Sequence, residues 1–240
     1  MRILVTGGSS GLGRAIVEIL AQNPDNEVFF TYCRKEDDAK DFAGFYGNVS
    51  CLKVDFTSAE SVDRFVESIS AMGLDALVNN AWVGKPTGTY FHKTDCEDYT
   101  KAFQYNVLPL VKISQACITK FRKQKHGSIV TVLTSYLLDL PPMGYSVYTA
   151  TKAYIEQLSK CWSKENARFG ITANCVSPEY MQTTFADVDE RVLEQMVHDH
   201  PLKRLLQPEE VAKVVTMLLD VSNQVNGINI PVNAAQHVIK

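Results

Sequence analysis

Two side chains that could take part in proton transfer, Tyr148 and Lys152, are four residues apart in the sequence. Residues at this spacing project from one face of a helix, one turn from each other. A phenol has an ordinary pKa of about 10, and a fixed ammonium group one turn away favours the phenolate and lowers that pKa. A tyrosine tuned in this way can pass a proton to or from an oxygen during a redox reaction. The same spacing is also common on exposed helix faces, so the pair alone does not establish an enzyme.

A glycine-rich segment near the start of the chain favours nucleotide binding. Residues 2–6 form an apolar run typical of a buried strand, residues 7–13 read Gly-Gly-Ser-Ser-Gly-Leu-Gly, and residues 14–21 have helical periodicity. In this context main-chain N–H groups and a helix N-terminus can face a pyrophosphate. The spacing differs from the familiar Gly-x-Gly-x-x-Gly. The Gly-Lys-Ser/Thr of a P-loop is also missing from the segment, which argues against ATP hydrolysis.

The end of the second strand, residues 27–32, indicates which dinucleotide would bind. An acid at this place hydrogen-bonds the free 2′-hydroxyl of the adenosine ribose. Here the strand is followed by Cys33, Arg34 and Lys35, and acids begin only at Glu36. The cations predict a preference for NADP(H), with NAD(H) also open. A solvated loop of mixed charge would have the same sequence.

The remaining apolar runs alternate with helical patterns along the whole chain. This alternation predicts an α/β fold: a doubly wound, seven-stranded parallel sheet of the Rossmann type, buried on both faces, in a single domain spanning residues 1–240. The polar stretch 182–200 predicts a lid that contains one short helix. The further strands are expected at 48–55, 74–78, 127–134, 170–176 and 226–232, and the further helices at 59–71, 97–123, 146–169 and 208–220.

Polar residues follow several of these expected strands. Asn79 and Asn80 end the fourth strand, where their amides can either tie neighbouring backbone together or line a ligand crevice, and the sequence leaves both roles open. Ser135 directly follows the fifth strand. Asn106 lies midway along an expected helix, where asparagine competes for backbone hydrogen bonds, so some local interaction should compensate for it.

The composition is that of an ordinary globular protein. Among 240 residues, 45% are apolar and 21% charged, and the net charge is −3. No basic run suggests nucleic-acid binding, and no apolar run approaches the roughly 20 residues that span a bilayer. Without a signal-peptide pattern, a soluble, cytoplasmic chain with no membrane partner is expected. The six cysteines are scattered, so neither a disulfide framework nor a metal site is expected.

Together, the motifs occur in one order over essentially the whole chain: the glycine loop, residues 79–81, Asn106, Ser135, the Tyr148/Lys152 pair and an Asn-x-x-x-Pro at 174–178. This ordered set resembles the short-chain dehydrogenase/reductase family in its compact single-domain branch. Residues 201–204 and 208–212 are similar to the corresponding segment of 3-oxoacyl-[acyl-carrier-protein] reductases.

The resemblance implies four catalytic residues. Tyr148 would be the general acid in reduction and the base in oxidation, and Ser135 would hydrogen-bond the substrate oxygen. Lys152 would lower the pKa of Tyr148 and hold the nicotinamide ribose. Asn106 would anchor a water chain that relays protons to Lys152.

The resemblance also implies a set of cofactor contacts. Asp55 would meet the adenine amino group, Asn80 and Ala81 the adenosine ribose, and Met181 and Thr183 the carboxamide and phosphates. The implied cofactor-binding set is Gly7, Ser9, Ser10, Gly11, Leu12, Gly13, Tyr32, Arg34, Asp55, Phe56, Asn80, Ala81, Trp82, Tyr148, Lys152, Pro178, Met181 and Thr183.

Three positions depart from the family pattern. Trp82 stands where the family usually has the glycine of Asn-Asn-Ala-Gly, so its indole must either point outward or narrow the site. Glu179 replaces a glycine after Pro178 and, if it points inward, would disfavour acidic substrates. Residues 232–235 read Val-Asn-Ala-Ala in place of Val-Asp-Gly-Gly.

The expected function is therefore an NADPH-dependent ketoreductase that interconverts a carbonyl and a secondary alcohol on a small substrate, free or carrier-bound. A homotetramer formed through helices 97–123 and 146–169 is expected from the resemblance. An NAD-dependent alcohol or sugar dehydrogenase is the alternative enzyme, and a non-catalytic nucleotide-sensing protein the alternative class. About 60 residues after Pro178 are too few for the substrate portion of a sugar-nucleotide epimerase or dehydratase.

Overall fold

The computed structural model, which describes residues 1–86, 88–183 and 188–236, contains one seven-stranded sheet. Its strand order is β3-β2-β1-β4-β5-β6-β7, and every neighbouring pair is parallel. The predicted doubly wound Rossmann-type sheet is confirmed. The strands are β1 (Arg2–Val5), β2 (Glu27–Tyr32), β3 (Val49–Lys53), β4 (Ala76–Asn79), β5 (Gly127–Val132), β6 (Ile171–Pro178) and β7 (Asn229–Val232).

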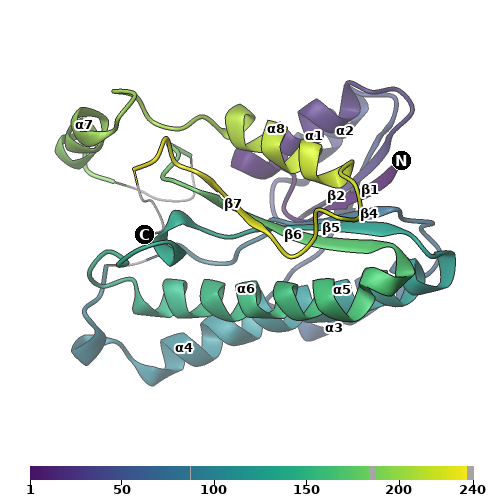
Figure 1. Cartoon of the computed structure of the whole chain (residues 1–240), viewed down its shortest axis with the longest axis horizontal. Helices are drawn as coiled ribbons and strands as arrows, with labels where there is room; N and C mark the ends of the chain where they lie inside the picture. Colours follow the sequence, from purple (N-terminus) through teal and green to yellow (C-terminus); the bar gives the residue numbers. More distant parts are fainter. Residues whose placement is uncertain (87, 184–187, 237–240) are drawn as a thin grey trace.

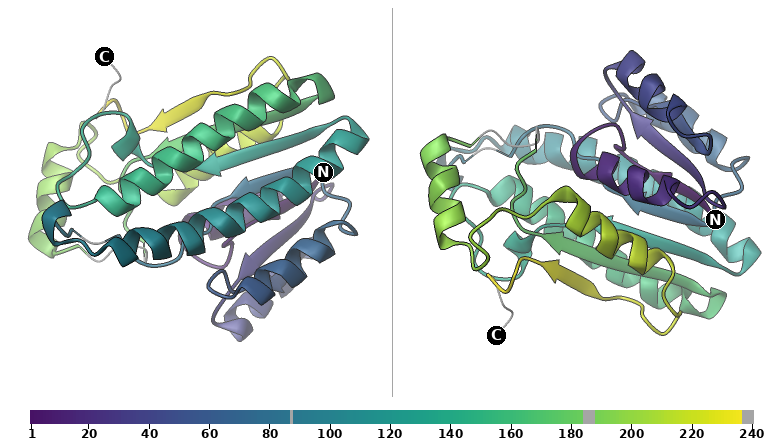
Figure 2. Two further views of the ribbon diagram at one scale, coloured as in Figure 1. Left: turned by 90° about the horizontal axis from the view of Figure 1, so that it is seen from below. Right: turned by 90° about the horizontal axis from the view of Figure 1, so that it is seen from above.

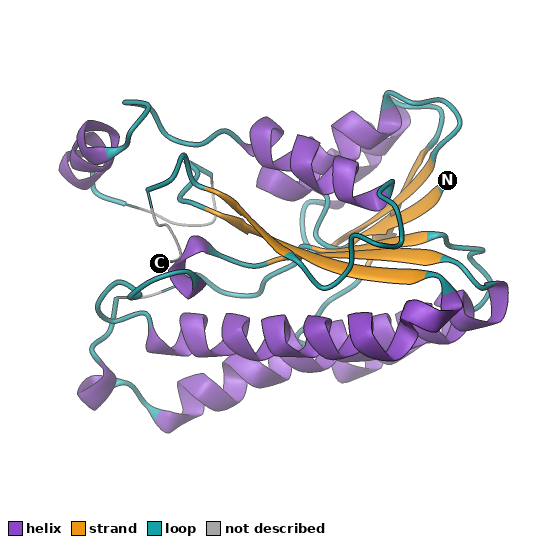
Figure 3. Cartoon of the chain, in the orientation of Figure 1, coloured by secondary structure: helices purple, strands orange, loops and turns teal. Residues whose placement is uncertain are grey.

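Helices cover both faces of the sheet (Figures 1 and 3). One face carries α1 (Gly11–Ala21), α2 (Glu36–Gly44) and α8 (Pro208–Leu219). The other carries α3 (Ala59–Ile69), α5 (Leu108–Gln124) and α6 (Ser146–Asn166), with α4 (Cys96–Ala102) leading into α5. Seen from below, α5 and α6 run alongside each other over the sheet (Figure 2). The helix α7 (Glu190–Asp199) lies apart, beyond the end of the sheet at which β7 stops (Figure 1).

Alternate residues of each central strand enter two separate hydrophobic cores. Ile3 and Val5 of β1 pack with α1 and α8, whereas Leu4 between them packs on the opposite side with α3 and α5. Successive side chains of a strand point to opposite faces, so a strand covered by helices on both sides needs apolar residues at every position. This explains the continuous apolar runs of β1 and β4.

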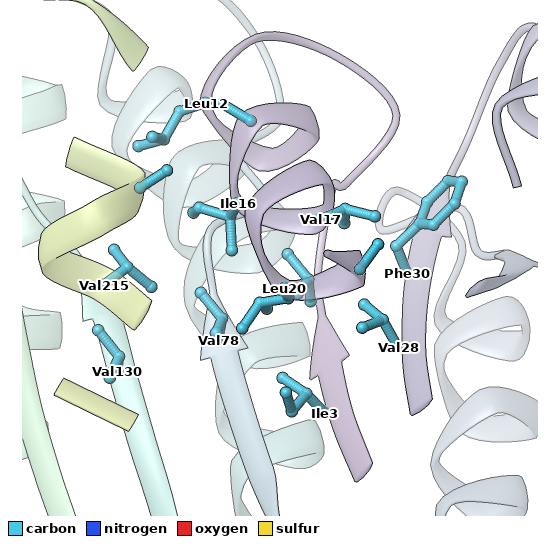
Figure 4. Packing of buried hydrophobic residues seen from close by; sticks show 14 of the residues in the cluster. Ile3, Leu12, Ile16, Val17, Leu20, Val28, Phe30, Val78, Val130 and Val215 are labelled. Atoms are coloured by element: carbon cyan, nitrogen blue, oxygen red, sulfur yellow. The ribbon is translucent and has the colours of Figure 1, made fainter. Parts of the chain in front are cut away.

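The helix α1 contributes one stripe to the first core. Leu12, Ile16 and Leu20 recur at intervals of four and face the sheet and α8, where Val215 meets them (Figure 4). Since α1 starts directly after the glycine loop, this packing fixes the position of the loop at the end of β1.

The strand order creates a crevice at one end of the sheet. From β1 the chain moves outward to β2 and β3, and then returns to place β4 on the other side of β1. In parallel α/β sheets a ligand crevice lies at the carboxyl ends of the strands where the order reverses in this way. The glycine loop after β1 and residues 80–82 after β4 therefore lie next to each other at this crevice.

Two helical regions differ from the sequence prediction. The helix α2 was not anticipated; three acidic residues in its first turn favour its start, and Ala39 and Phe42 bury one face. The expected helix 97–123 is divided into α4, a π-helical segment (Phe103–Val107) and α5. The short helix expected within the lid stretch 182–200 is α7, although residues 184–187 of that stretch lie outside the described part.

Within the described residues, no helix is both long and apolar enough to cross a membrane. Those residues also contain no group of three or more His, Cys, Asp or Glu side chains arranged to hold a metal ion. All six cysteines are free.

A methyl group at Gly13 should break the packing between the glycine loop and β4. A Cβ there would lie 2.1 Å from the Gly7 carbonyl oxygen and 2.5 Å from Asn80 Nδ2, neither of which has room to move. We expect Gly13→Ala to lower the free energy of unfolding by about 1–3 kcal/mol, measured by chemical denaturation. Gly47→Ala is the control, because a Cβ at Gly47 meets no atom within 4 Å. Equal stability of the two variants would contradict this account of the loop.

Candidate active site

The glycine loop is held at the end of β1 by main-chain contacts with β2. The N–H of Gly7 donates to Thr31 Oγ1 at 2.9 Å, and that of Gly8 donates to the Thr31 carbonyl at 3.0 Å. Gly7 has a left-handed φ of 67°, and a Cβ on it would lie 2.9 Å from Ala81 Cα. This close approach leaves a backbone cradle at the N-terminus of α1, a place suited to a pyrophosphate. Ser9 and Ser10 lie at its tip, and the Ser10 side chain makes no capping bond.

The two asparagines after β4 tie backbone together. Asn80 Nδ2 donates to the carbonyls of Thr6 and Gly7 at 3.0 and 3.1 Å, so it joins the glycine loop to β4. Asn79 Nδ2 is buried and donates to Ser114 Oγ at 3.1 Å, which links β4 to α5. Of the two roles that the sequence left open, the structure gives both side chains the structural one.

Thr6 completes this junction, although the sequence analysis did not single it out. Its Oγ1 accepts hydrogen bonds from the main-chain N–H groups of Asn80 and Ala81 at 3.0 and 3.1 Å. A hydroxyl residue between an apolar strand and a glycine loop is the signal that could have marked it.

At the adenosine end of the crevice the nearest acid is already paired. Glu36 bonds Lys40 and Lys53 at 2.8 and 2.9 Å, and these lysines lower its pKa to about 2. Hydrogen bonds from Thr57 lower the pKa of Asp55, so this carboxylate is charged and turned toward its own loop. Arg34 is exposed at the end of β2, where a 2′-phosphate would need a cation.

Three of the expected cofactor-binding side chains are instead part of the hydrophobic core. Leu12, Tyr32 and Phe56 are 8%, 5% and 8% exposed and pack within the two clusters. Only their main chain can face the crevice. Hydrophobic side chains beside a binding loop are generally taken up by the adjoining core, which a motif match by itself does not reveal.

Tyr148 and Lys152 lie on the first two turns of α6, as predicted, but the ammonium does not point at the phenol oxygen. Lys152 Nζ donates to the Val132 carbonyl at 2.8 Å and lies 5.9 Å from the centre of the Tyr148 ring. Tyr148 hydrogen-bonds the side chain of Thr134. Thr134, directly before Ser135 at the end of β5, is a site residue that the sequence analysis missed.

The expected lowering of the Tyr148 pKa is not found in this structure. Burial raises the pKa of Tyr148 above its ordinary value, and the bond with Thr134 offsets only part of this effect. Burial also lowers the pKa of Lys152 to about 7. Both shifts have one cause, since loss of contact with water disfavours the charged form of each group: Lys152 is buried and Tyr148 is half-buried. The sequence spacing could not show this desolvation.

Ser135 begins a short 3-10 turn three residues after the end of β5 at Val132 and is 1% exposed. Among the described residues its Oγ has no hydrogen-bond partner. A buried hydroxyl left without a partner is costly, and such groups concentrate where a ligand completes the bonding. The unpaired oxygen therefore fits a site that receives a polar atom of a substrate.

Asn106 lies in the π-helical segment and is 4% exposed. Its Oδ1 accepts from the Val83 N–H at 2.6 Å, and its Nδ2 donates to the Val83 carbonyl at 3.3 Å. This pair of bonds is the compensation expected for an asparagine inside a helix. The bonds hold the strand-end segment 81–83 against the helix, and π-helical turns are frequent at functional sites.

Aromatic rings surround Tyr148. The indole of Trp82 packs edge-to-face against it, with ring centres 4.9 Å apart. The ring of Tyr136 makes a second edge-to-face contact with Tyr148, with ring centres 6.2 Å apart. Tyr145 packs edge-to-face on Tyr136 at 5.6 Å. Trp82 thus narrows the site, one of the two outcomes that the sequence allowed.

The segment after β6 closes the other side. Glu179 directly follows Pro178, is 8% exposed, and accepts from the Tyr180 N–H at 3.2 Å. Burial, and then the charges of Tyr145 and Glu179, raise the pKa of Tyr136, so the Glu179 carboxylate lies within electrostatic reach of this ring. Met181 bridges to Leu206, and Thr183 lies in van der Waals range of a Cβ placed on Gly11.

Comparison with known proteins agrees with this geometry. A family model described as enoyl-(acyl carrier protein) reductase matches residues 7–235. An acetoacetyl-CoA reductase from Shinella zoogloeoides is 31% identical over 98% of this chain and 98% of its own length. The chain belongs to the short-chain dehydrogenase/reductase family.

Other members of the family are similar over the same length. A 3-oxoacyl-[acyl-carrier-protein] reductase from Thermotoga maritima is 29% identical over 93% of this chain and 92% of its own. The solved structure titled "ElxO with NADP Bound" has a TM-score of 0.87 at 25% identity and covers 98% of both chains. An actinorhodin polyketide ketoreductase with NADPH has a TM-score of 0.86 at 22% identity, with 98% and 97% covered, and supports the shared fold.

Lys152 should make this short-chain dehydrogenase/reductase more stable as pH rises above neutrality. The unfolded chain keeps the lysine proton up to its ordinary pKa of 10.5, but the folded chain releases it near about 7. Between these values the unfolded state binds more protons, so the free energy of unfolding should rise with pH by up to about 1.4 kcal/mol per unit.

Chemical denaturation of the parent and of Lys152→Met at about pH 7.5 and 9 isolates this effect, because other groups are common to both proteins. The parent should gain stability relative to the variant at the higher pH. Lys164→Met, an exposed lysine on the same helix, should show no such gain. A pH-independent difference between the parent and Lys152→Met would refute the burial of an ionisable amine.

Proposed function

We propose that this protein is an NADPH-preferring ketoreductase that reduces a carbonyl group to a secondary alcohol. The observation that carries the proposal is the buried Ser135 hydroxyl, which has no hydrogen-bond partner among the described residues and directly follows Thr134, a neighbour of Tyr148. A carbonyl oxygen that bonded both Ser135 and Tyr148 would complete this arrangement. The complete set of Ser135, Tyr148 and Lys152 favours an enzyme over a nucleotide-sensing protein.

Each residue of the set has a role that follows from its surroundings. Burial keeps the Tyr148 phenol protonated at neutral pH, so it can donate a proton to the oxygen that forms on a reduced carbonyl. Ser135 donates a second hydrogen bond to that oxygen and stabilises its developing charge. When bound, a nicotinamide cofactor supplies the hydride. Lys152, charged, would favour loss of the Tyr148 proton and bind the ribose, and Asn106 would hold the proton relay in place.

The residues present fit a dinucleotide. Gly7 lies in backbone contact with Ala81 and leaves no room for a side chain, which fixes the glycine loop at the N-terminus of α1, where main-chain N–H groups can face a pyrophosphate. Arg34 is exposed near Asp55, and the adjacent Glu36 is neutralised by two lysines, which supports a 2′-phosphate and so NADP(H) over NAD(H). Asp55, Asn80 and Ala81 would meet the adenosine, and Met181 and Thr183 the nicotinamide end and the phosphates.

The relatives support a substrate with a carbonyl on an acyl chain. The named relatives are an acetoacetyl-CoA reductase and a 3-oxoacyl-[acyl-carrier-protein] reductase, both of which reduce a 3-oxo group on a thioester. For this chain we infer a small carbonyl substrate, free or carrier-bound. The aromatic rings of Trp82 and Tyr136 would line its apolar part, and Glu179 would disfavour an acidic group close to the carbonyl.

Three further inferences complete the proposal. Residues 1–240 act as one oxidoreductase domain, and the described part of the stretch 182–200, which is residues 182–183 and 188–200, belongs to a lid over the crevice, supported by Thr183 beside Gly11. The protein works in the cytoplasm, which suits six free cysteines. Four copies assemble into a homotetramer through the long helices.

Removing the Tyr148 hydroxyl should abolish carbonyl reduction. We expect Tyr148→Phe to lower kcat by at least about 100-fold, the usual contribution of a positioned general acid, with the NADPH dissociation constant nearly unchanged. Oxidation of NADPH with a panel of 3-oxoacyl thioesters and simple ketones is the measurement. Tyr46→Phe, at a tyrosine that packs on Phe42 and Phe45 away from the site, is the control. Activity within about tenfold of the parent would exclude Tyr148 as the acid.

Removing the Arg34 cation should affect NADPH more than NADH. A charge-assisted bond to the 2′-phosphate is lost only with NADPH, so we expect Arg34→Ala to weaken NADPH binding about tenfold or more and to leave NADH binding unchanged. Calorimetric titration of both cofactors gives the ratio of the NADPH and NADH dissociation constants. Arg64→Ala, an exposed arginine on α3, should leave it unaltered. An unchanged ratio in Arg34→Ala would reject the assignment of NADP(H).

The tetramer should depend on an apolar groove beside α5. Phe103, Leu108 and Tyr154 are 38%, 44% and 47% exposed, and the groove at Phe103 and Leu108 has a volume of about 520 Å³. Light scattering should give about four times the chain mass of 26.8 kDa. Leu108→Glu should give smaller species, because a charge would be buried in the interface. Phe45→Glu, at an exposed apolar residue away from these helices, should leave the mass unchanged, and a monomeric parent would refute the tetramer.

A further inference from the structure

The indole of Trp82 lies across the side chain that a cofactor should meet. Its ring centre is 4.8 Å from Lys152 Nζ, within the range of a cation–π contact. The same ring packs edge-to-face on Tyr148 at 4.9 Å and 75°. Trp82 thus contacts both Tyr148 and Lys152. It stands where the short-chain dehydrogenase/reductase pattern usually has a glycine.

The backbone on both sides of Trp82 is fixed, so only its side chain can move. The Ala81 N–H donates to Thr6 Oγ1 at 3.1 Å. Val83 exchanges two hydrogen bonds with the Asn106 side chain, at 2.6 and 3.3 Å. The indole can therefore leave Lys152 by rotation about its own side-chain bonds without disturbing β4.

Lys152 has bonding capacity that the described residues leave open. An ammonium has three N–H donors. Within the described part of the chain, one hydrogen bond is formed, to the Val132 carbonyl, and the side chain is 5% exposed. The indole face takes the place of a polar partner. Hydroxyl groups of a ribose would be stronger partners for this cation, but they cannot lie where the ring lies.

We infer that Trp82 is a gate on the cofactor site: its indole caps the Lys152 ammonium in the free protein and turns away when a nicotinamide nucleotide binds. The inference rests on the proposed function for the identity of the cofactor and not for the carbonyl chemistry. Because only the open form accepts the ribose, the apparent dissociation constant is raised in inverse proportion to the population of that form.

Cofactor affinity of variants at this position tests the gate. Trp82→Ala removes the cap, and Trp82→Phe keeps a smaller ring. By calorimetric titration at about pH 6, where Lys152 is charged, we expect Trp82→Ala to bind NADP⁺ and NADPH about 10- to 100-fold more tightly than the parent, from the usual strength of one cation–π and one aromatic contact. The affinity of Trp82→Phe should lie between those of Trp82→Ala and the parent. Unchanged or weaker binding by a folded Trp82→Ala would overturn the inference, since the indole would then be part of the cofactor site.

A fluorescence measurement keeps the test valid if Trp82→Ala does not fold. The chain has two tryptophans, Trp82 and Trp162, so Trp162→Phe leaves the gate residue as the only reporter. NADP⁺ should increase the quenching of its emission by acrylamide, because the indole leaves the Tyr148–Lys152 surface. Unchanged or reduced quenching at saturating NADP⁺ would contradict the gate. Trp82→Phe, which retains only Trp162, is the matched control and should show no change.

The gate and the proposed reaction fail separately. Tighter NADPH binding in Trp82→Ala, with no oxidation of NADPH by any tested carbonyl in the parent, would support the gate and refute the ketoreductase. Carbonyl reduction by the parent, with unaltered cofactor affinity in Trp82→Ala, would support the ketoreductase and refute the gate.

Discussion

The burial of one amine organises this site. Lys152 is a residue that water normally solvates, and its removal from water disfavours the ammonium strongly enough to bring its pKa down to about 7. Its contacts come from three different parts of the chain: the carbonyl of Val132 at the end of β5, the indole of Trp82 after β4, and the Tyr148 ring on its own helix. A lysine in such surroundings can gain or lose its charge near pH 7, and a ligand that changes the surroundings can shift this equilibrium.

The sheet makes these contacts possible, because all the contributing segments end at the same edge. Parallel strands deliver the glycine loop and residues 80–82 to neighbouring positions, and the reversal of strand order between β1 and β4 opens the crevice there. Small residues and side-chain ties then set the spacing. Gly7 and Gly13 allow backbone contact that a methyl group would prevent, and Asn80 holds the loop to β4 through two carbonyls.

Aromatic rings contact Tyr148 and one another. Trp82, Tyr136 and Tyr145 form a continuous set of edge-to-face contacts around Tyr148, and Glu179 adds a buried carboxylate beside them. These aromatic side chains suit an apolar or planar group next to the carbonyl of the substrate. These residues surround Tyr148 in this chain, and Trp82 and Glu179 are two of the positions that depart from the pattern of the family it resembles.

The sequence by itself determined the α/β alternation, the all-parallel sheet and the edge at which the site lies, because periodicity and loop chemistry are local properties. The ordered motifs also indicated the family, and they predicted that Ser135 follows the fifth strand and that Tyr148 and Lys152 share one helix. The sequence did not determine the α2 helix, the division of the long helix by a π-helical segment, or the core positions of Leu12, Tyr32 and Phe56. Each of these depends on what other segments pack against the residues concerned.

Only the tertiary structure decided how the site residues act on one another. The spacing of Tyr148 and Lys152 predicted an acidified phenol, but the folded chain buries Lys152, half-buries Tyr148 and turns the ammonium toward Val132 and Trp82. The direction of the Trp82 indole and the structural role of Asn80 were equally open before the fold was known. Side-chain direction and loss of water are set by neighbours distant in sequence, and no local pattern records them.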